Sequence, residues 1–364
     1  ASGLTTGTQA AARGPRARWW PWVVAAAVVL VAGFGWKFLR PGPAPPPKLI
    51  TVTSFAGQEW SPALSPDGKQ VAFAWDGEDQ KGPGIFIKLV DTGAPLRLTT
   101  GRDSYPAWSP DGRHIAFVRL GRDPGYLVIP ALGGPERKIA AIPRIPSHAA
   151  HLSLDWSRDG KQIVLVDTSL PVANLSLVPL EGGAPARLSN PPAESFGDFL
   201  PKVSPDGRSI AFLRCMSTNV GELYRADLSG TALGAAKLVY KPSVTFLIDY
   251  SWARDGRELI ASDRFQGQVT LFRIPLTGSG SPALIPGAGS DAREPAVALE
   301  ADRLAFAHSV SDSNLWRMPL HPQGVAAAEQ VFASSRPDAQ ADYSPDGKRI
   351  VFSSDRSGAT DILV

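Results

Sequence analysis

The sequence predicts an all-β protein, a seven-bladed β-propeller of four-stranded blades that is preceded by one transmembrane α-helix. Two observations predict the propeller: a turn motif occurs seven times at spacings of 44 to 49 residues, and short apolar strands flank each copy. A fixed period in the forties with several strands per unit is typical of propeller blades. The third observation, an uncharged apolar run near the N-terminus, predicts the helix.

The turn motif reads Ser-Pro-Asp-Gly in four copies, which begin at Ser65, Ser109, Ser204 and Ser344, and it is altered in the other three. Proline sets φ at the first turn position, aspartate bonds its own backbone, and glycine accepts the left-handed conformation that closes a hairpin. This chemistry explains the aspartates without a repeated metal site, so we predict a structural role. The turn residues are Asp67, Gly68, Asp111, Gly112, Asp159, Gly160, Asp206, Gly207, Asp255, Gly256, Asp346 and Gly347.

Each motif is expected to join an inner strand to a second, apolar strand, as in residues 105–109 and 114–118. A short fourth strand, as in residues 96–99, completes each unit. The third strands are expected at residues 84–90, 126–132, 173–180, 222–228, 269–276 and 314–320. Because one blade cannot bury both of its faces, the blades must stack around an axis.

Closure of the ring requires the last blade to be tied to the first. The chain stops within the third strand of the seventh unit, while residues 49–53 precede the first inner strand and have no earlier blade to join. We expect residues 49–53 to supply the outer strand of the seventh blade and so to clasp the ring. A six-bladed ring with a loose seventh unit is the alternative.

The apolar run covers residues 19–36 and contains no charged side chain. At 1.5 Å per residue it spans about 27 Å, close to the thickness of a bilayer core. Tryptophans near both of its ends suit the two membrane interfaces. A buried helix would show a polar face, and a signal peptide would have a shorter run with a cleavage site. We therefore expect a helix from Trp19 to Leu39 that spans the membrane.

The formal net charge is +3, but the six basic residues before residue 49 have no acidic counterpart, so the rest of the chain carries −3. Three of them precede the helix, and the positive-inside rule then favours a cytoplasmic N-terminus and an extracytoplasmic, periplasmic propeller at the inner membrane. The chain thus divides into a basic flank (1–18), the transmembrane helix (19–39), a proline-rich spacer (40–48) and a propeller with a truncated last blade (49–364).

The in-period SPDG copies resemble the TolB-like, WD-repeat-like family of β-propellers over residues 49–364. The order of helix, spacer and WSPALSPDGKQVAFAWDG resembles bacterial membrane-anchored sensors, in which a winged-helix regulator or a Ser/Thr kinase domain precedes the helix. The resemblance implies an extracytoplasmic sensor domain that binds a protein or another ligand, with a cytoplasmic effector upstream. The alternatives are an accessory propeller of a prolyl-peptidase-like hydrolase and a TolB-like envelope assembly protein.

Catalytic motifs are absent from the sequence: it has no GxSxG elbow, no phosphate-binding loop and no HExxH. We therefore expect no catalysis within this chain, no cofactor and no metal. The single cysteine, Cys215, excludes a disulfide scaffold. The negative charge of the propeller argues against nucleic acid as its ligand.

A propeller usually binds its ligand at one end of the central channel, where the loops before the inner strands converge. On this basis the candidate binding face, for a protein or peptide, comprises Glu59, Trp60, Asp103, Ser104, Phe196, Asp198, Asp291 and Arg293. Trp108, Trp156 and Trp252 each precede a turn motif. Their periodic placement favours packing between blades over ligand binding.

Overall fold

The computed structural model describes residues 48–77, 82–146, 151–217, 220–242, 249–265, 268–277 and 280–309, together with positions 3 and 25. Between 314 and 364 it describes all but 319, 322–323, 326, 333, 335–337, 355 and 357–360. The chain forms two compact units, residues 1–48 and 49–364. Apart from positions 3 and 25, the basic flank, nearly all of the spacer and the helix expected at 19–39 lie outside the described residues. Within the described part of the chain, no helix is long and apolar enough to cross a membrane.

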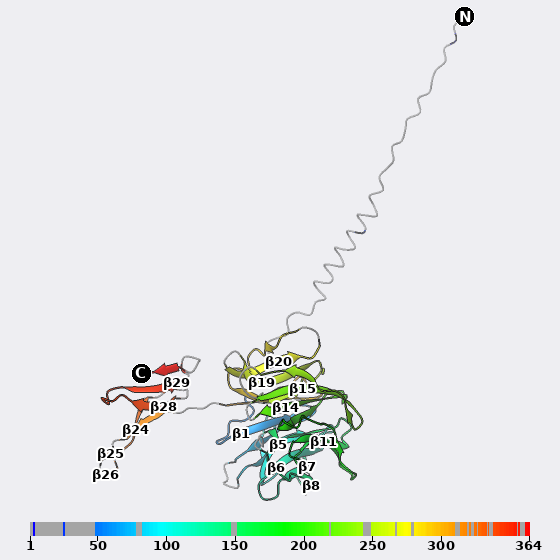
Figure 1. Ribbon diagram of the computed structural model, residues 1–364, viewed down its shortest axis with the longest axis horizontal. Helices are drawn as coiled ribbons and strands as arrows, with labels where there is room; N and C mark the ends of the chain where they lie inside the picture. The colour runs from blue at the N-terminus through cyan, green and yellow to red at the C-terminus, as the bar shows by residue number, and fades with distance from the viewer. Residues whose placement is uncertain are drawn as a thin grey trace. The chain divides into compact units, whose positions relative to one another are not determined.

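Five successive antiparallel sheets form blades 1 to 5 (Figure 1). Blade 1 contains β1 (Glu59–Leu64), β2 (Gln70–Trp75), β3 (Gly84–Leu89) and β4 (Leu96–Arg97). Blade 2 contains β5 (Arg102–Trp108), β6 (His114–Leu120), β7 (Gly125–Pro130) and β8 (Arg137–Ala141). Blade 3 contains β9 (Leu154–Trp156), β10 (Gln162–Asp167), β11 (Asn174–Pro179) and β12 (Ala186–Arg187). The all-β prediction and the order of strands in these blades are therefore confirmed.

Blades 4 and 5 follow the same order, with one addition. Blade 4 contains β13 (Gly197–Val203), β14 (Ser209–Ser217), β15 (Val220–Ser229), the short β16 (Ala232–Leu233) and β17 (Lys237–Tyr240). Both β16 and β17 pair with β15. Blade 5 contains β18 (Asp249–Trp252), β19 (Glu258–Phe265), β20 (Gln268–Pro275) and β21 (Ala283–Leu284).

The turn motif forms a small hydrogen-bonded network, for which blade 2 is representative. The Ser109 hydroxyl donates to Asp111 Oδ1 at 2.6 Å, and the same oxygen accepts the Arg113 N–H at 3.0 Å. Gly112, with φ of 69°, donates its N–H to the Ser109 carbonyl at 2.9 Å. The serine hydroxyl bond is the largest cause that lowers the pKa of Asp111. Among the described residues, no group of three side chains is placed to hold a metal ion.

Neighbouring blades are joined through the tryptophans that precede the turns. The indole N–H groups of Trp108, Trp156 and Trp252 donate to the carbonyls of Ala63, Ala107 and Lys202 in the preceding blade, at 2.9 to 3.0 Å. All three indoles are buried. The packing role predicted for these tryptophans is thus confirmed, because each one satisfies its polar atom across a seam between blades.

The ring closes after six blades. The sixth consists of β22 (Ala292–Val297) and β23 (Leu304–His308), and both strands lie against β1. The Glu300 N–H donates to the Pro66 carbonyl at 2.8 Å, and Arg303 donates to the Gly68 carbonyl at 2.9 Å. Because blade 6 bonds directly to blade 1, no seam remains for another blade. The prediction of seven blades in one ring is therefore wrong, and its six-bladed alternative is correct.

The predicted clasp is also wrong, because residues 49–53 form no strand. Val52 and Phe55 instead pack in a buried cluster between blades 1 and 6. The Phe55 ring lies 4.9 Å from the Trp75 ring, and the Trp75 indole donates to the Ala56 carbonyl at 2.9 Å. Blade 6 has only two strands in the described residues, and the N-terminal segment contributes apolar side chains to the seam beside them.

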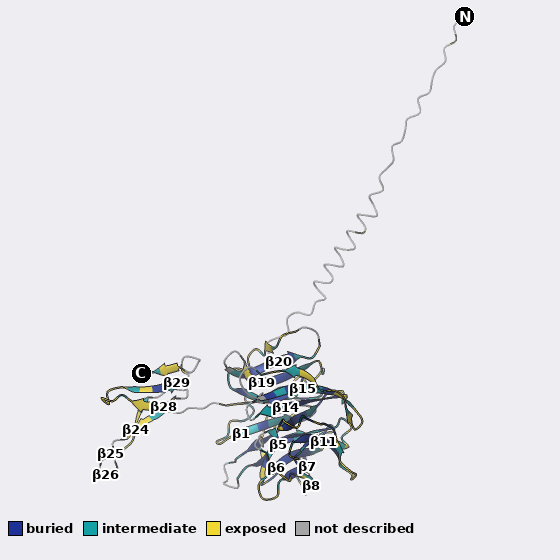
Figure 2. Cartoon of the chain, in the orientation of Figure 1, coloured by how far each residue is buried: buried dark blue, intermediate teal, exposed yellow. Residues whose placement is uncertain are grey.

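The remaining strands form separate small sheets. They are β24 (Leu315–Arg317) with β27 (Glu329–Phe332), β25 (Leu320–His321) with β26 (Gly324–Val325), and the three-stranded β28 (Asp338–Tyr343), β29 (Ile350–Ser354) and β30 (Asp361–Leu363). The seventh copy of the turn motif joins β28 to β29. Strands such as β14 and β20 are largely buried, whereas β28 and β30 carry mostly exposed residues (Figure 2).

Replacing Trp156 by phenylalanine should test the bond between blades 2 and 3. The Trp156→Phe variant leaves the half-buried Ala107 carbonyl without its donor and opens a small cavity, so the free energy of unfolding should fall by roughly 2–3 kcal/mol. Urea unfolding followed by circular dichroism measures the change. Leu132→Ala, at a side chain that is 91% exposed, is the control and should shift stability by less than about 0.5 kcal/mol. Equal effects of the two substitutions would contradict this account of the seam.

Candidate functional site

Four of the six inner strands carry a β-bulge four residues before the start of the turn motif. The bulged residues are Ser61, Tyr105, Leu200 and Glu294, with φ between 49° and 53°. Each is followed by a proline, which lacks the N–H that a regular ladder would use and which strands tolerate at bulges. The inner strands without such a proline, β9 and β18, have Ser153 and Asp249 at this position and no bulge in their pairing with the second strand.

These positions bring charged groups from different blades together. The charges of Asp249 and Lys202 shift the pKa of Glu294 in opposite directions. The charges of Glu294 and Asp249 both raise the pKa of Tyr105. Tyr105, Lys202, Asp249 and Glu294 belong to blades 2, 4, 5 and 6. The first strands of successive blades contact one another around the whole ring. The four groups, which all lie on first strands, are therefore placed where the inner strands converge around the central channel.

Glu294 connects this cluster to the closure of the ring. Its Oε2 atom accepts the Ser61 N–H at 2.5 Å, across the seam between blades 6 and 1. Burial, with a smaller contribution from the charge of Asp249, raises the pKa of Glu294 to about 7, although the Ser61 bond opposes the change. The residue as a whole is half-buried. Its carboxyl group is therefore held deep in the protein in a residue that still reaches solvent.

The neighbouring groups are also perturbed by burial. Burial raises the pKa of Asp249, and the charge of Lys202 and a 2.6 Å bond from the Tyr250 N–H oppose the increase. Burial also raises the pKa of Tyr105 well above its usual range, so its phenol remains a hydrogen-bond donor at neutral pH. The cluster thus combines two carboxyl groups, one ammonium group and one neutral phenol.

Two hydroxyls at the same strand position are buried without a hydrogen-bond partner in the described structure, those of Ser61 and Ser153. Their residues are 6% and 0% exposed. Buried polar atoms are nearly always hydrogen-bonded in proteins, so unsatisfied ones call for a specific explanation. Ser61 adjoins the Glu294 carboxylate through its own N–H. A bound polar group at the channel would provide such a partner.

Of the candidate binding face, Asp103 and Asp198 serve the fold. Both are fully buried, and each carboxylate receives two bonds of 2.7 to 3.0 Å from an arginine on the second strand, Arg119 or Arg214. A paired, desolvated carboxylate of this kind has little capacity left for a ligand. Phe196 is 39% exposed, and its backbone bonds to Ala173 and Cys215 on neighbouring strands.

Glu59, Trp60 and Ser104 lie at the junction of blades 1 and 2. The Trp60 indole donates to the Ser104 hydroxyl at 3.3 Å, so the structure brings these two predicted residues together. Glu59 accepts the Thr53 hydroxyl at 2.7 Å, and burial is the main cause that raises the pKa of Glu59. Its second carboxylate oxygen is buried without a partner in the described structure.

Asp291 and Arg293 form an ion pair of 3.6 Å beside Glu294. Arg293 directly precedes Glu294, as Ser104 directly precedes Tyr105, so two predicted residues adjoin the channel cluster in sequence. Tyr105, Lys202, Asp249 and Glu294 themselves were missed, because the prediction stopped at the first residues of the inner strands. A polar residue before a proline, as in Tyr105-Pro106 and Glu294-Pro295, is the signal that could have identified two of them.

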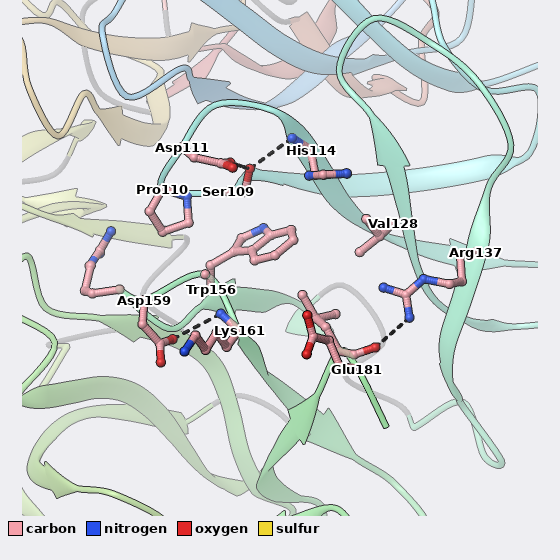
Figure 3. A pocket seen from close by; sticks show the side chains of 13 residues that line it. Ser109, Pro110, Asp111, His114, Val128, Arg137, Trp156, Asp159, Lys161 and Glu181 are labelled. Carbon is pink, nitrogen blue, oxygen red and sulfur yellow. Dashed lines mark hydrogen bonds between the residues drawn. The ribbon is translucent and has the colours of Figure 1, made fainter. Parts of the chain in front are cut away.

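A hollow with a volume of about 490 Å³ lies between blades 2 and 3 (Figure 3). Asp111 and Asp159, on its wall, are already bonded within their own turns. Arg137 crosses it to bond the Leu180 carbonyl at 2.8 Å. The charged side chains Asp111, Asp159 and Arg137 in this hollow therefore already bond to other groups of the fold. The central channel is the stronger candidate site.

The raised pKa of Glu294 predicts a pH-dependent stability. The pKa of Glu294 rises from 4.5 in the unfolded chain to about 7 in the folded state. The stabilisation from such a group is complete below pH 4.5 and is lost as the pH rises through about 7. Glu294→Gln keeps an acceptor for the Ser61 N–H but stays neutral. The variant should therefore be more stable than wild type at pH 8, by roughly 1–3 kcal/mol, and no more stable at pH 4.5.

Urea unfolding at the two pH values measures this difference. The exposed Glu194→Gln substitution is the control for loss of one carboxylate and should leave the pH profile of wild type unchanged. A Glu294→Gln variant with the same pH profile as wild type would show that the carboxyl is not desolvated in the fold.

This chain is similar in sequence and in fold to known β-propeller proteins. No family model matches it. Over 185 residues, 50% of the chain, it is 29% identical to the Tol-Pal system protein TolB of Francisella tularensis subsp. tularensis (strain WY96-3418), of which it covers 41%. The crystal structure of TolB from Acinetobacter baumannii superposes with a TM-score of 0.55 at 19% identity, over 67% of this chain and 58% of that one.

A puromycin hydrolase structure gives a TM-score of 0.50 at 14% identity and covers 83% of this chain and 59% of its own. The chain therefore spans less than two thirds of the length of each of these proteins. At these identities the structural likeness concerns the fold, and the fold is a TolB-like β-propeller.

Proposed function

We propose that this chain is a non-catalytic, membrane-tethered propeller that binds a protein or peptide at its central channel, outside the cytoplasm. The observation that carries the proposal is the channel cluster: the charge of Arg293 also acts on Glu294, but Arg293 is paired with Asp291, so that Asp249 and Glu294 outnumber the remaining cation, Lys202. Such a site favours a ligand with a cationic group, such as a lysine side chain or a free peptide N-terminus. The unsatisfied hydroxyls of Ser61 and Ser153 add hydrogen-bonding capacity.

Binding of a cation would relieve an electrostatic cost. Both carboxyl groups have raised pKa values because burial disfavours their charged forms. An ammonium or guanidinium group placed between them would restore the charged forms and form charge-assisted hydrogen bonds. The Tyr105 phenol stays protonated and can donate to a carbonyl of the same ligand. This set orients a ligand but contains no activated nucleophile, which supports a binding role.

The proposed sensor role rests on the chain's architecture. The helix expected at Trp19–Leu39 and the basic flank before it would place the propeller outside the cytoplasm, behind a winged-helix or kinase effector. A relative that is named as a Tol-Pal system protein supports a protein ligand. It equally supports the alternative of a TolB-like role in envelope assembly.

Short charged peptides provide a direct test of the channel. Tetralysine should bind the full chain more tightly than tetraglutamate, because the carboxyl groups outnumber the ammonium group. Glu294→Gln and Asp249→Asn should each weaken tetralysine binding about tenfold or more, equivalent to about 1.4 kcal/mol. Calorimetric titration at pH 7.5 measures the affinities, with Glu194→Gln as the matched control. Equal affinities for the two peptides, or a tetralysine affinity that neither channel substitution lowers, would refute the proposed site.

An accessory propeller of a hydrolase is the second candidate, favoured by the likeness to the puromycin hydrolase structure over 83% of this chain. In that role the propeller would sit beside a separate catalytic domain and need not discriminate between charged peptides. The peptide titration therefore separates the two functions.

The orientation in the membrane can be tested by reporter fusions. Alkaline phosphatase, which is active only outside the cytoplasm, should be active when fused after Val364 and inactive when fused after Arg18. The reason is the three arginines that precede the apolar run, against two basic residues, Lys37 and Arg40, that closely follow it. Whole-cell phosphatase assays, normalised to the amount of fusion protein, give the readout. The reverse pattern would overturn the topology.

A further inference from the structure

Six residues occupy equivalent places around the channel, one in each blade, four positions before each turn motif. This channel ring consists of Ser61, Tyr105, Ser153, Leu200, Asp249 and Glu294. Five of the six are polar, whereas blade 4 contributes leucine. Blade 4 instead carries a charged, half-buried side chain two residues later, that of Lys202.

Two hydrogen bonds hold this part of blade 4 against blade 5. The Tyr250 hydroxyl donates to the Leu200 carbonyl at 2.5 Å, and the Trp252 indole donates to the Lys202 carbonyl at 2.9 Å. Asp249 directly precedes Tyr250, so these bonds place it beside Lys202. Burial raises the pKa of both Asp249 and Glu294, and the charge of Lys202 opposes the increase in each. The lysine ammonium group therefore acts on both carboxyl groups of the channel.

Lys202 differs from the cations that pair with buried aspartates elsewhere in the fold. Arg119 and Arg214 each donate two bonds of 2.7 to 3.0 Å to such an aspartate. In the described part of the chain, Lys202 forms no ion pair with Asp249 or Glu294. Lysine is a compact charge on a flexible stem, whereas arginine presents a rigid fork. Lys202 thus supplies charge to the channel without a fixed contact.

The channel ring also keeps acceptors that no protein group uses. Asp249 accepts the Tyr250 N–H at 2.6 Å through Oδ1, and Glu294 accepts the Ser61 N–H at 2.5 Å through Oε2. The second oxygen of each carboxyl group accepts no hydrogen bond from any residue that the structure describes. The buried hydroxyls of Ser61 and Ser153 lack a partner as well. Because an ammonium group carries three donors and no acceptor, it matches this set of oxygens.

We propose that Lys202 is the resident cation of the channel ring, and that a ligand binds by placing its own primary ammonium group between Asp249 and Glu294 while Lys202 moves toward solvent. This inference rests on the proposed function and adds the residue that limits affinity and selects the ligand. A ligand ammonium that reaches the serine hydroxyls gains bonds that Lys202 does not make. Weaker cations do not displace the lysine, so the site selects for a primary amine.

A purely structural role of Lys202 gives the opposite expectation. If the lysine only compensated the two buried carboxyl groups, its loss would favour their neutral forms and weaken the binding of a cationic ligand. A resident cation instead repels and competes with the ligand, so its loss strengthens binding. The direction of the change in affinity therefore separates the two roles.

Calorimetric titration of the full chain with tetralysine at pH 8.5 measures that direction. This pH lies above the pKa of Glu294, about 7, and below the ordinary lysine pKa of about 10.4. The Lys202→Gln variant should bind tetralysine about tenfold more tightly than wild type or better. Lys202→Arg keeps the charge and should bind no more tightly than wild type. Lys237→Gln, which removes an exposed lysine of the same blade, is the matched control and should leave the affinity unchanged.

Labelling of the wild-type chain gives an independent measurement. Displacement moves Lys202 toward solvent, so its acetylation by acetic anhydride, relative to that of Lys237, should rise when tetralysine saturates the protein. Peptide mass spectrometry gives this ratio. Saturation that leaves the ratio unchanged, or a Lys202→Gln variant that binds no more tightly than wild type, would overturn the inference.

The proposed function is judged separately by Glu294→Gln in the same titration. If this variant weakens tetralysine binding while Lys202→Gln has no effect, the channel remains the binding site and only the role of Lys202 is wrong. If wild type does not bind tetralysine, the proposed function and this inference are both refuted.

Discussion

The structure depends on one constraint: each blade leaves an apolar face that only another blade can cover. The chain meets it with the same bond at three seams, a tryptophan indole that reaches the carbonyl of the preceding blade. The anchor sits directly before the turn motif, and the serine–aspartate network of the motif fixes the turn that follows. Local turn chemistry and packing between blades are therefore coupled in each repeat.

Closure at six blades creates the channel and its chemistry together. The inner strands converge, and the proline-linked bulges place Ser61, Tyr105 and Glu294 in strained backbone conformations at equivalent positions. Glu294 both joins blade 6 to blade 1 and carries a raised pKa. The residue that closes the ring is thus electrostatically unfavourable in its charged form. Strain and unfavourable burial of this kind persist where the surrounding structure enforces them, often at functional sites.

The seam between blades 1 and 6 differs from the others in how it is covered. The seams among blades 1 to 5 lie between sheets of four or five strands, whereas here Val52 and Phe55 join the apolar cluster beside the two strands of blade 6. The central channel is therefore a consequence of where the ring closes.

The sequence by itself determined the repeat, the strand order of the first five blades and the packing of the tryptophans, because turn chemistry and strand periodicity are local. It could not determine the number of blades in the ring, since closure depends on the accumulated rotation between blades and not on the number of motif copies. It also placed Asp103 and Asp198 on a binding face, whereas the structure pairs each with an arginine 16 residues later. Tertiary structure alone brought Tyr105, Lys202, Asp249 and Glu294 together, because they lie on four blades and meet only once the ring has closed.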